Sequence, residues 1–170
     1  DLPDPARFND LEALKTLGMK LVLTSGTFDL IHVGHARYME RAKSFGDVLI
    51  VGVDSDAKVK LRKGPTRPIV PEQERVQMLA FLRSVDLITL KQPDDPKWGL
   101  IKLVQPDTLI VTAETYTDAE LKKLEKLCGK VVVLAPQATT STSAQIRRMQ
   151  ISWSANIVDP LTEVLALPEL

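Results

Sequence analysis

Two histidines, His32 and His35, stand where a predicted strand gives way to a predicted helix. The preceding run 20–25 is apolar and rich in β-branched residues, which predicts a buried strand. Residues 36–43 have the composition and spacing of a helix. Side chains three residues apart lie on one side of the first helical turn, whose free N–H groups and positive dipole end attract anions. Two hydrogen-bonding imidazoles at that turn predict a site for a polyphosphate.

The segment that leads to the histidines supplies further candidates for nucleotide contact. They are Ser25, Gly26, Thr27, Phe28, Asp29 and Gly34. Gly26 and Gly34 carry no Cβ, so we expect their backbone to approach the ligand closely.

Residues 26–35 read G-T-F-D-L-I-H-V-G-H and resemble the signature of the cytidylyltransferase-like branch of the nucleotidyltransferase superfamily. From about residue 7 to residue 149 the chain is similar to the adenylyltransferase domain of ADP-heptose synthase and to glycerol-3-phosphate cytidylyltransferase. The resemblance implies transfer of a nucleoside monophosphate from a nucleoside triphosphate to a phosphorylated small molecule, with release of pyrophosphate. Strand–helix alternation and the resemblance together predict an α/β fold of three layers, Rossmann-like, with a mainly parallel five-stranded sheet.

Two other interpretations of the histidines stay open at this stage. Zinc needs at least three protein ligands, so Asp29 would have to complete a site with His32 and His35. Alternatively, the histidines only cap the helix. We expect no metal bound by the protein alone. Mg²⁺, which keeps much of its water shell, is expected as a cofactor held mainly by the substrate phosphates.

Residues 58–68 form the most basic stretch of the chain. Glycine and proline predict an irregular loop, and it follows Asp54 at the carboxyl end of a predicted strand, where parallel sheets bind their ligands. The plain alternative is a solvated surface loop. The stretch resembles the K-G-P-x-R-P-I loop of ADP-heptose synthase domains, which makes Lys63 the expected phosphate contact and Lys60 the next.

Strands and helices alternate through the rest of the chain. Apolar runs predict further strands at 47–53, 87–90, 108–111 and 130–134. Helical patterns and caps predict helices at 9–17, where Asn9 is the expected cap and Gly18 the end, and at 71–82, 94–104 and 118–128.

Two arginines near the helix 71–82 receive different predictions. Similar families carry an arginine at the position of Arg83 that helps to hold phosphates, so Arg83 is a candidate catalytic residue. The alternative is that Arg83 only stabilises the negative end of the helix dipole at the helix C-terminus. Arg75 is expected to be a structural ion-pair partner.

Residues 112–116, T-A-E-T-Y, depart from the similar families, which have a glycine-containing turn with an aspartate here. Thr112, Glu114 and Tyr116 are candidates for nucleotide contact, but neither the base nor the acceptor follows from them. Farther on, Ser141, Thr142 and Ser143 resemble a phosphate-binding helix start, and the hydroxyl run exceeds what capping requires. The arginine that similar proteins often place before this run is absent.

Composition predicts a protein without a nucleic-acid or membrane partner. The chain has 170 residues, with 22 basic and 22 acidic side chains, so its net charge is zero. A single cysteine and an acidic N-terminus unlike a secretion signal favour a cytoplasmic location. We expect a nucleotidyltransferase domain over 1–150, and an apolar extension over 151–170 that packs on the domain or on a second copy in a homodimer.

Three functions remain open from the sequence. The loop around Lys63 favours an adenylyltransferase that acts on a phosphorylated sugar, with ATP as donor. The G-T-F-D sequence at residues 26–29 favours a cytidylyltransferase of a phosphorylated alcohol such as glycerol 3-phosphate. The altered turn and the missing arginine are also compatible with a nucleotide-binding module that has lost catalysis.

Overall fold

The computed structural model describes residues 5–113, 115–135, 146–149 and 151. The chain divides into two units, Asp1–Gln137 and Ala138–Leu170, and in the second only a short helical stretch is described. The fold and the site below belong to the first unit. Predictions for Glu114, Ser141, Thr142, Ser143 and the extension 152–170 lie outside the described residues.

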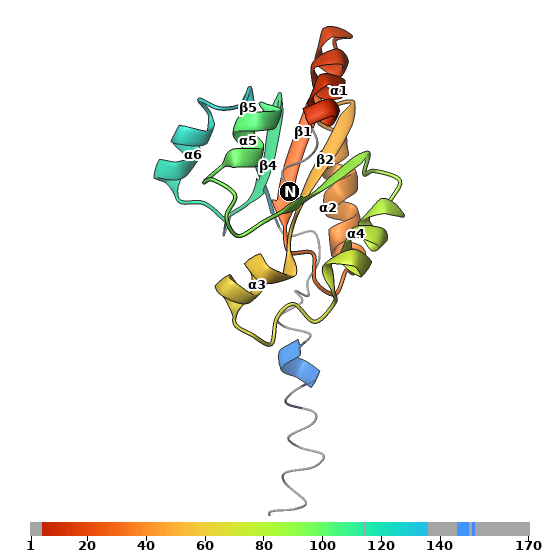
Figure 1. The fold of residues 1–170 in the computed structure, drawn as a ribbon, viewed down its shortest axis with the longest axis vertical. Coiled ribbons are helices and arrows are strands. Elements are labelled where there is room, and N and C mark those ends of the chain that lie inside the picture. Colours follow the sequence, from red (N-terminus) through yellow and green to blue (C-terminus); the bar gives the residue numbers. More distant parts are fainter. Residues whose placement is uncertain (1–4, 114, 136–145, 150, 152–170) are drawn as a thin grey trace, which may run out of the picture. The chain divides into compact units, whose positions relative to one another are not determined.

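A five-stranded sheet in the order β3-β2-β1-β4-β5 forms the centre of the first unit (Figure 1). Every pair of neighbouring strands is parallel, so the prediction of a mainly parallel five-stranded sheet is confirmed. The strands are β1 Leu21–Gly26, β2 Val48–Asp54, β3 Leu87–Lys91, β4 Thr108–Thr112 and β5 Lys130–Leu134. Because all strands run the same way, their carboxyl ends gather at one edge of the sheet.

Helices cover both faces of the sheet and make the three predicted layers. Their bounds are α1 Pro5–Thr16, α2 Val33–Lys43, α3 Asp56–Lys63, α4 Glu72–Ala80, α5 Gly99–Val104 and α6 Asp118–Leu124. Figure 1 shows α2 and α4 on one side of the strands and α5 and α6 on the other. In the same view α3 lies beyond the tips of β1 and β2, whereas α1 lies at the opposite edge.

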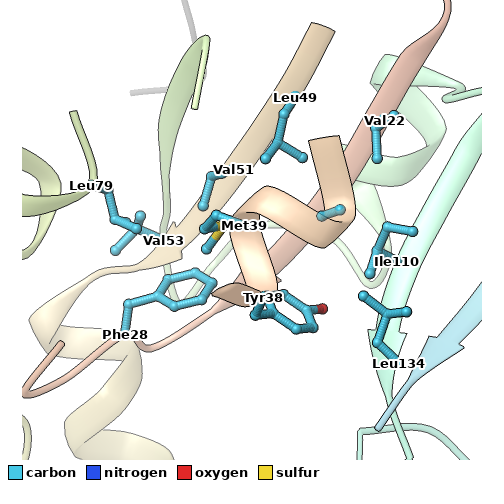
Figure 2. Close-up of a cluster of buried hydrophobic side chains, with 11 residues drawn as sticks. Val22, Phe28, Tyr38, Met39, Leu49, Val51, Val53, Leu79, Ile110 and Leu134 are labelled. Atoms are coloured by element: carbon cyan, nitrogen blue, oxygen red, sulfur yellow. The ribbon is translucent and has the colours of Figure 1, made fainter. Parts of the chain in front are cut away.

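Strand β1 contributes side chains to two separate hydrophobic cores, because successive side chains of a strand point to opposite faces of the sheet. Val22 belongs to the core on the face covered by α2 and α4, which also contains Met39 and Leu79 (Figure 2). Leu21 and Leu23 pack in the other core, with residues from α5 and α6. Burial on both faces explains why β1 and β2 are apolar almost throughout.

Several predicted helix boundaries are wrong. α1 begins at Pro5, so Asn9 lies inside the helix and does not cap it, although Gly18 follows the helix with φ of +80° as expected. The helix predicted from Asp94 begins only at Gly99, because Gln92 and Asp95 form a turn in which the Asp95 carboxylate accepts the Gln92 N–H at 2.7 Å. α6 ends at Leu124, four residues before the predicted end.

The basic stretch 58–68 is only partly a loop, so that prediction is also corrected. Residues up to Lys63 belong to α3, which Ser55 caps by accepting the Lys58 N–H at 3.2 Å. Lysine and arginine are good helix formers and suit the negative end of the helix dipole. Gly64, with φ of +94°, ends the helix and opens the loop.

Arg75 on α4 ties three separate segments together at the carboxyl edge. Its side chain is buried and donates hydrogen bonds to the carbonyls of Thr27 and Val70 and, at 2.7 Å, to the carboxylate of Asp56. This confirms that Arg75 is a structural ion-pair partner. The guanidinium fixes the segment before the histidines against the loop and the start of α3.

We predict that Arg75→Met destabilises the fold by about 2–4 kcal/mol, because two buried carbonyls and one carboxylate lose their partner. Urea denaturation at pH 7 measures the loss. Lys20→Met is the control, since the Lys20 ammonium pairs with Asp107 while its side chain is 64% exposed, and it should cost less than about 1 kcal/mol. Equal losses in the two variants would contradict the role of Arg75.

Candidate active site

The two histidines form the first turn of α2, as predicted. His32 is the N-cap residue, and its Nδ1 accepts the N–H of Gly34 at 3.1 Å. The backbone N–H of His32 donates in turn to Nδ1 of His35 at 3.3 Å. The ring centroids lie 4.3 Å apart, so the imidazoles are neighbours on one side of the turn.

These hydrogen bonds fix which nitrogen of each ring is left to donate. Because Nδ1 accepts in both rings, a neutral imidazole carries its proton on Nε2. Burial, together with the nearby His32, lowers the pKa of His35 to about 4, so the ring is neutral near pH 7. Capping therefore uses one nitrogen of each ring and leaves one N–H donor per ring for a ligand.

The turn between β1 and the histidines has unusual backbone. Phe28 and Leu30 have φ of 53° and 49°, in the left-handed region. The turn buries Phe28 in the core beside α2 and α4 (Figure 2). A Cβ on Gly26 would lie 3.0 Å from the Phe28 ring, so glycine at this position makes room for Phe28. The expectation that the Gly26 backbone also approaches the ligand closely stays a prediction.

Asp29 is buried and faces the loop after α3. Its carboxylate accepts the N–H groups of Ile69 and Val70 and pairs with Arg67 at 2.7 Å. Burial alone would raise the pKa of Asp29, but these hydrogen bonds and the arginine hold it below its ordinary value. The alternative of a metal site completed by Asp29 is not supported: the described residues contain no group of three potential metal ligands.

The five cations of the basic stretch separate into two groups. Lys58 donates to the Gln92 carbonyl at 2.8 Å, Arg62 pairs with Asp54, and Arg67 pairs with Asp29. Lys60 and Lys63 make no ion pair with any described carboxylate within 4.0 Å. Partial burial and the neighbouring Arg62 and Arg67 lower the pKa of Lys63. An anion beside Lys63 would relieve that repulsion.

Other predicted residues lie at the same edge of the sheet. Ser25 is the second-last residue of β1, and Asp54, which is buried, ends β2. Thr112 ends β4, and its hydroxyl shares a hydrogen bond of 2.7 Å with that of Thr115. Burial, then Glu120 and Asp54, raise the pKa of Tyr116. Its phenol therefore stays protonated at neutral pH.

Arg83 does not lie near the histidines. It follows α4 and precedes Asp86, whose carboxylate accepts the Leu49 N–H at 2.6 Å near the start of β2. The crossover helix returns the chain to the amino edge of the sheet, one strand length from His32. The structure therefore does not bring Arg83 into the site. A surface depression of about 310 Å³ also lies at that edge, lined in part by Lys15, Lys20 and Asp107.

Sequence reasoning missed how Asp54 and Arg62 act together. The Arg62 guanidinium donates to Asp54 and, at 2.8 Å, to the hydroxyl of Thr27. Helical spacing could have shown Arg62 in the last turn of a helix that Ser55 starts.

Comparison with known proteins decides the family. Residues 23–157 match the cytidylyltransferase-like family. The chain belongs to that family. It is therefore a nucleotidyltransferase domain, which confirms the resemblance seen in the signature segment.

Relatives of this family member include much longer proteins. Bifunctional protein HldE of Sulfurimonas denitrificans is 47% identical over 152 residues, and that of Helicobacter acinonychis is 40% identical over 144 residues. The matches cover 82% and 85% of this chain but 30% of each relative. The chain thus spans about three tenths of the length of these relatives.

Solved structures share the fold. A lipopolysaccharide core biosynthesis protein from Thermoplasma volcanium is 32% identical with a TM-score of 0.59, and the match covers 70% of this chain and 98% of that one. Pantoate-beta-alanine ligase from Francisella tularensis, at 18% identity and a TM-score of 0.54, matches over 75% of this chain and 64% of its own. The second likeness shows the fold alone.

In the described part of the chain, no helix is long and apolar enough to cross a membrane.

We predict that His35 makes the fold less stable in acid. Its pKa of about 4 lies below the ordinary 6.5, so the unfolded chain binds the proton first and the folded state loses stability as the pH falls from 6.5 towards 4. Between pH 7 and pH 5 the loss should be about 1–2 kcal/mol. His35→Asn, which keeps an acceptor for the His32 N–H, should lack this part of the pH dependence in urea denaturation. Parallel curves for the two proteins would contradict the lowered pKa.

Proposed function

We propose that this domain transfers AMP from ATP to a phosphorylated sugar and releases pyrophosphate. The observation that carries the proposal is the first turn of α2, where two neighbouring imidazoles each leave an Nε2–H donor for an anion. Lys63, with no described carboxylate in ion-pair range, lies on α3 at the same sheet edge. Imidazole N–H donors, a helix N-terminus and ammonium groups suit the oxygens of a triphosphate.

The reaction needs positioning more than proton transfer. The acceptor phosphate is largely ionised near neutral pH, because its second pKa is about 6. It attacks the α-phosphorus in line, a new P–O bond forms, and the bond to the β-phosphate oxygen breaks as pyrophosphate leaves. His32, His35 and Lys63 stabilise the charge that spreads over the phosphate oxygens in the transition state. Ser141, Thr142 and Ser143 are proposed to add hydroxyl donors.

Magnesium fits this site as an ion held by phosphates. Asp29 and Asp54, two carboxylates at this edge of the sheet, are already paired with arginines. Mg²⁺ keeps several waters and binds through substrate phosphates in such sites. It would neutralise phosphate charge, while the chain supplies the donors.

ATP is favoured over CTP by two observations. The loop after α3 resembles that of ADP-heptose synthase domains, and relatives at 40–47% identity are bifunctional proteins HldE. A CTP-dependent transfer to glycerol 3-phosphate is the second candidate, because the G-T-F-D signature resembles those enzymes as well. Thr112, Glu114 and Tyr116 are proposed to contact the nucleoside. The homodimer remains a proposal that rests on the apolar residues of 151–170.

Pyrophosphate release tests the proposal. ATP, CTP, GTP and UTP are each combined with Mg²⁺ and a panel of sugar phosphates and glycerol 3-phosphate. We expect the highest kcat/KM for ATP with a sugar 1-phosphate. Preference for CTP with glycerol 3-phosphate would establish the second candidate instead, and ATP binding without pyrophosphate release for any acceptor would indicate a binding module.

His32→Asn tests in the same assay whether the His32 imidazole binds phosphate or only caps the helix. Asparagine is a good N-cap, so the variant keeps the start of α2 while it removes the Nε2–H donor. We expect the free energy of unfolding to stay within about 1 kcal/mol of the parent's, and turnover to be lower by about 10²–10³-fold. Turnover within a fewfold of the parent would show that His32 only caps the helix.

A further inference from the structure

Asp54 binds two cations at the carboxyl edge of the sheet. The carboxylate is 1% exposed and ends β2. One oxygen accepts from Arg62 at 2.8 Å, and the other lies 3.3 Å from the ammonium of Lys91 at the end of β3. Since a buried charge is costly without a partner, two cations around one carboxylate give a stable cluster that keeps one positive charge in excess.

Lys91 reaches Asp54 across a glycine. A Cβ on Gly52 would lie 2.9 Å from Cδ of Lys91 and 2.6 Å from Leu100. The absence of a side chain at Gly52 therefore lets the Lys91 chain lie flat on β2. The ammonium is held beside Asp54 at the ligand edge and does not extend into solvent.

Arg62 uses one nitrogen for protein contacts and presents the rest. A single terminal nitrogen, Nη2, donates both to Asp54 and to the hydroxyl of Thr27, each at 2.8 Å. Nε and Nη1 make no hydrogen bond to a described residue, and the side chain is 54% exposed. Thr27 lies in the segment that leads to His32, so the guanidinium is fixed beside that segment.

The geometry points to Arg62, with Lys91 behind it, as the site for the phosphate group of the acceptor, and to Asp54 as the residue that positions both cations. A planar guanidinium with free donors matches two oxygens of a phosphate monoester. The excess charge favours a dianion, and the pKa of Lys63, next along the chain, is lowered by burial and then by Arg62. The imidazoles and the N-terminus of α2 remain for the triphosphate. The assignment of this phosphate to the acceptor rests on the proposed function, whereas the phosphate site itself does not.

Direct binding tests the assignment without any need for turnover. Titration calorimetry measures the Kd of mannose 1-phosphate, as the sugar phosphate probe, and separately of ATP with Mg²⁺, for the parent and for Arg62→Met. We expect Arg62→Met to raise the Kd of the sugar phosphate at least tenfold and to change the Kd of ATP less than twofold. The fold should survive, because Asp54 keeps Lys91 as its partner, and thermal unfolding checks this.

Two further variants separate positioning from simple charge. Arg62→Lys keeps the charge without the planar fork and should recover only part of the affinity. Asp54→Asn frees both cations and should raise the KM for the acceptor more than it lowers kcat at pH 7. Lys122→Met, on the exposed surface of α6, is the charge control and should change neither Kd.

If Arg62→Met weakens the binding of both ligands equally, or the binding of ATP alone, the assignment is overturned and Arg62 contacts the triphosphate. Unchanged binding of both ligands would also overturn it. If the parent binds the sugar phosphate through Arg62 but releases no pyrophosphate with any nucleotide, the proposed function fails while the phosphate site stands.

Discussion

The buried guanidinium of Arg75 is the interaction on which the site depends. It holds the carbonyls of Thr27 and Val70 and the carboxylate of Asp56, three groups from segments that are far apart in the sequence. Asp29 makes the complementary set of bonds, from the histidine segment to the loop. Together they hold the turn before α2 in a backbone conformation that is uncommon for residues other than glycine.

That turn determines where the imidazoles lie. With Phe28 buried and Asp29 anchored, His32 starts α2 at the carboxyl edge of β1. Nδ1 of each ring then accepts a backbone N–H, so Nε2 of each imidazole is the nitrogen left to donate. A capping role and a ligand-binding role are therefore compatible, because they use different nitrogens of the same ring.

Much of the fold could be predicted from the sequence because it depends on local pattern. Buried parallel strands leave nearly continuous apolar runs, and all five were predicted at their observed places. α3 was misjudged because a run of lysine and arginine suits both a charged loop and a helix. The boundary errors at Asn9 and Asp94 arose where a capping residue or a proline also fits a turn or a helix interior.

The site was less predictable because its contacts join distant segments. The signature gave His32 and His35, but nothing local shows that Asp29 faces Ile69 and Val70, or that Gly26 makes room for Phe28. Arg83 was predicted from the arginine that similar families carry at this position, whereas the direction of the crossover helix places it at the far edge. The pairing of Arg62 with Asp54 depends on both the helix and the strand, and only the structure shows it.

The most direct test of the account is a crystal structure with Mg²⁺ and a non-hydrolysable ATP analogue. The account predicts phosphate oxygens within about 3.2 Å of Nε2 of both His32 and His35, at the N-terminus of α2. A nucleotide bound in the depression beside Lys15 and Asp107, or imidazoles that make no contact with the phosphates, would contradict it.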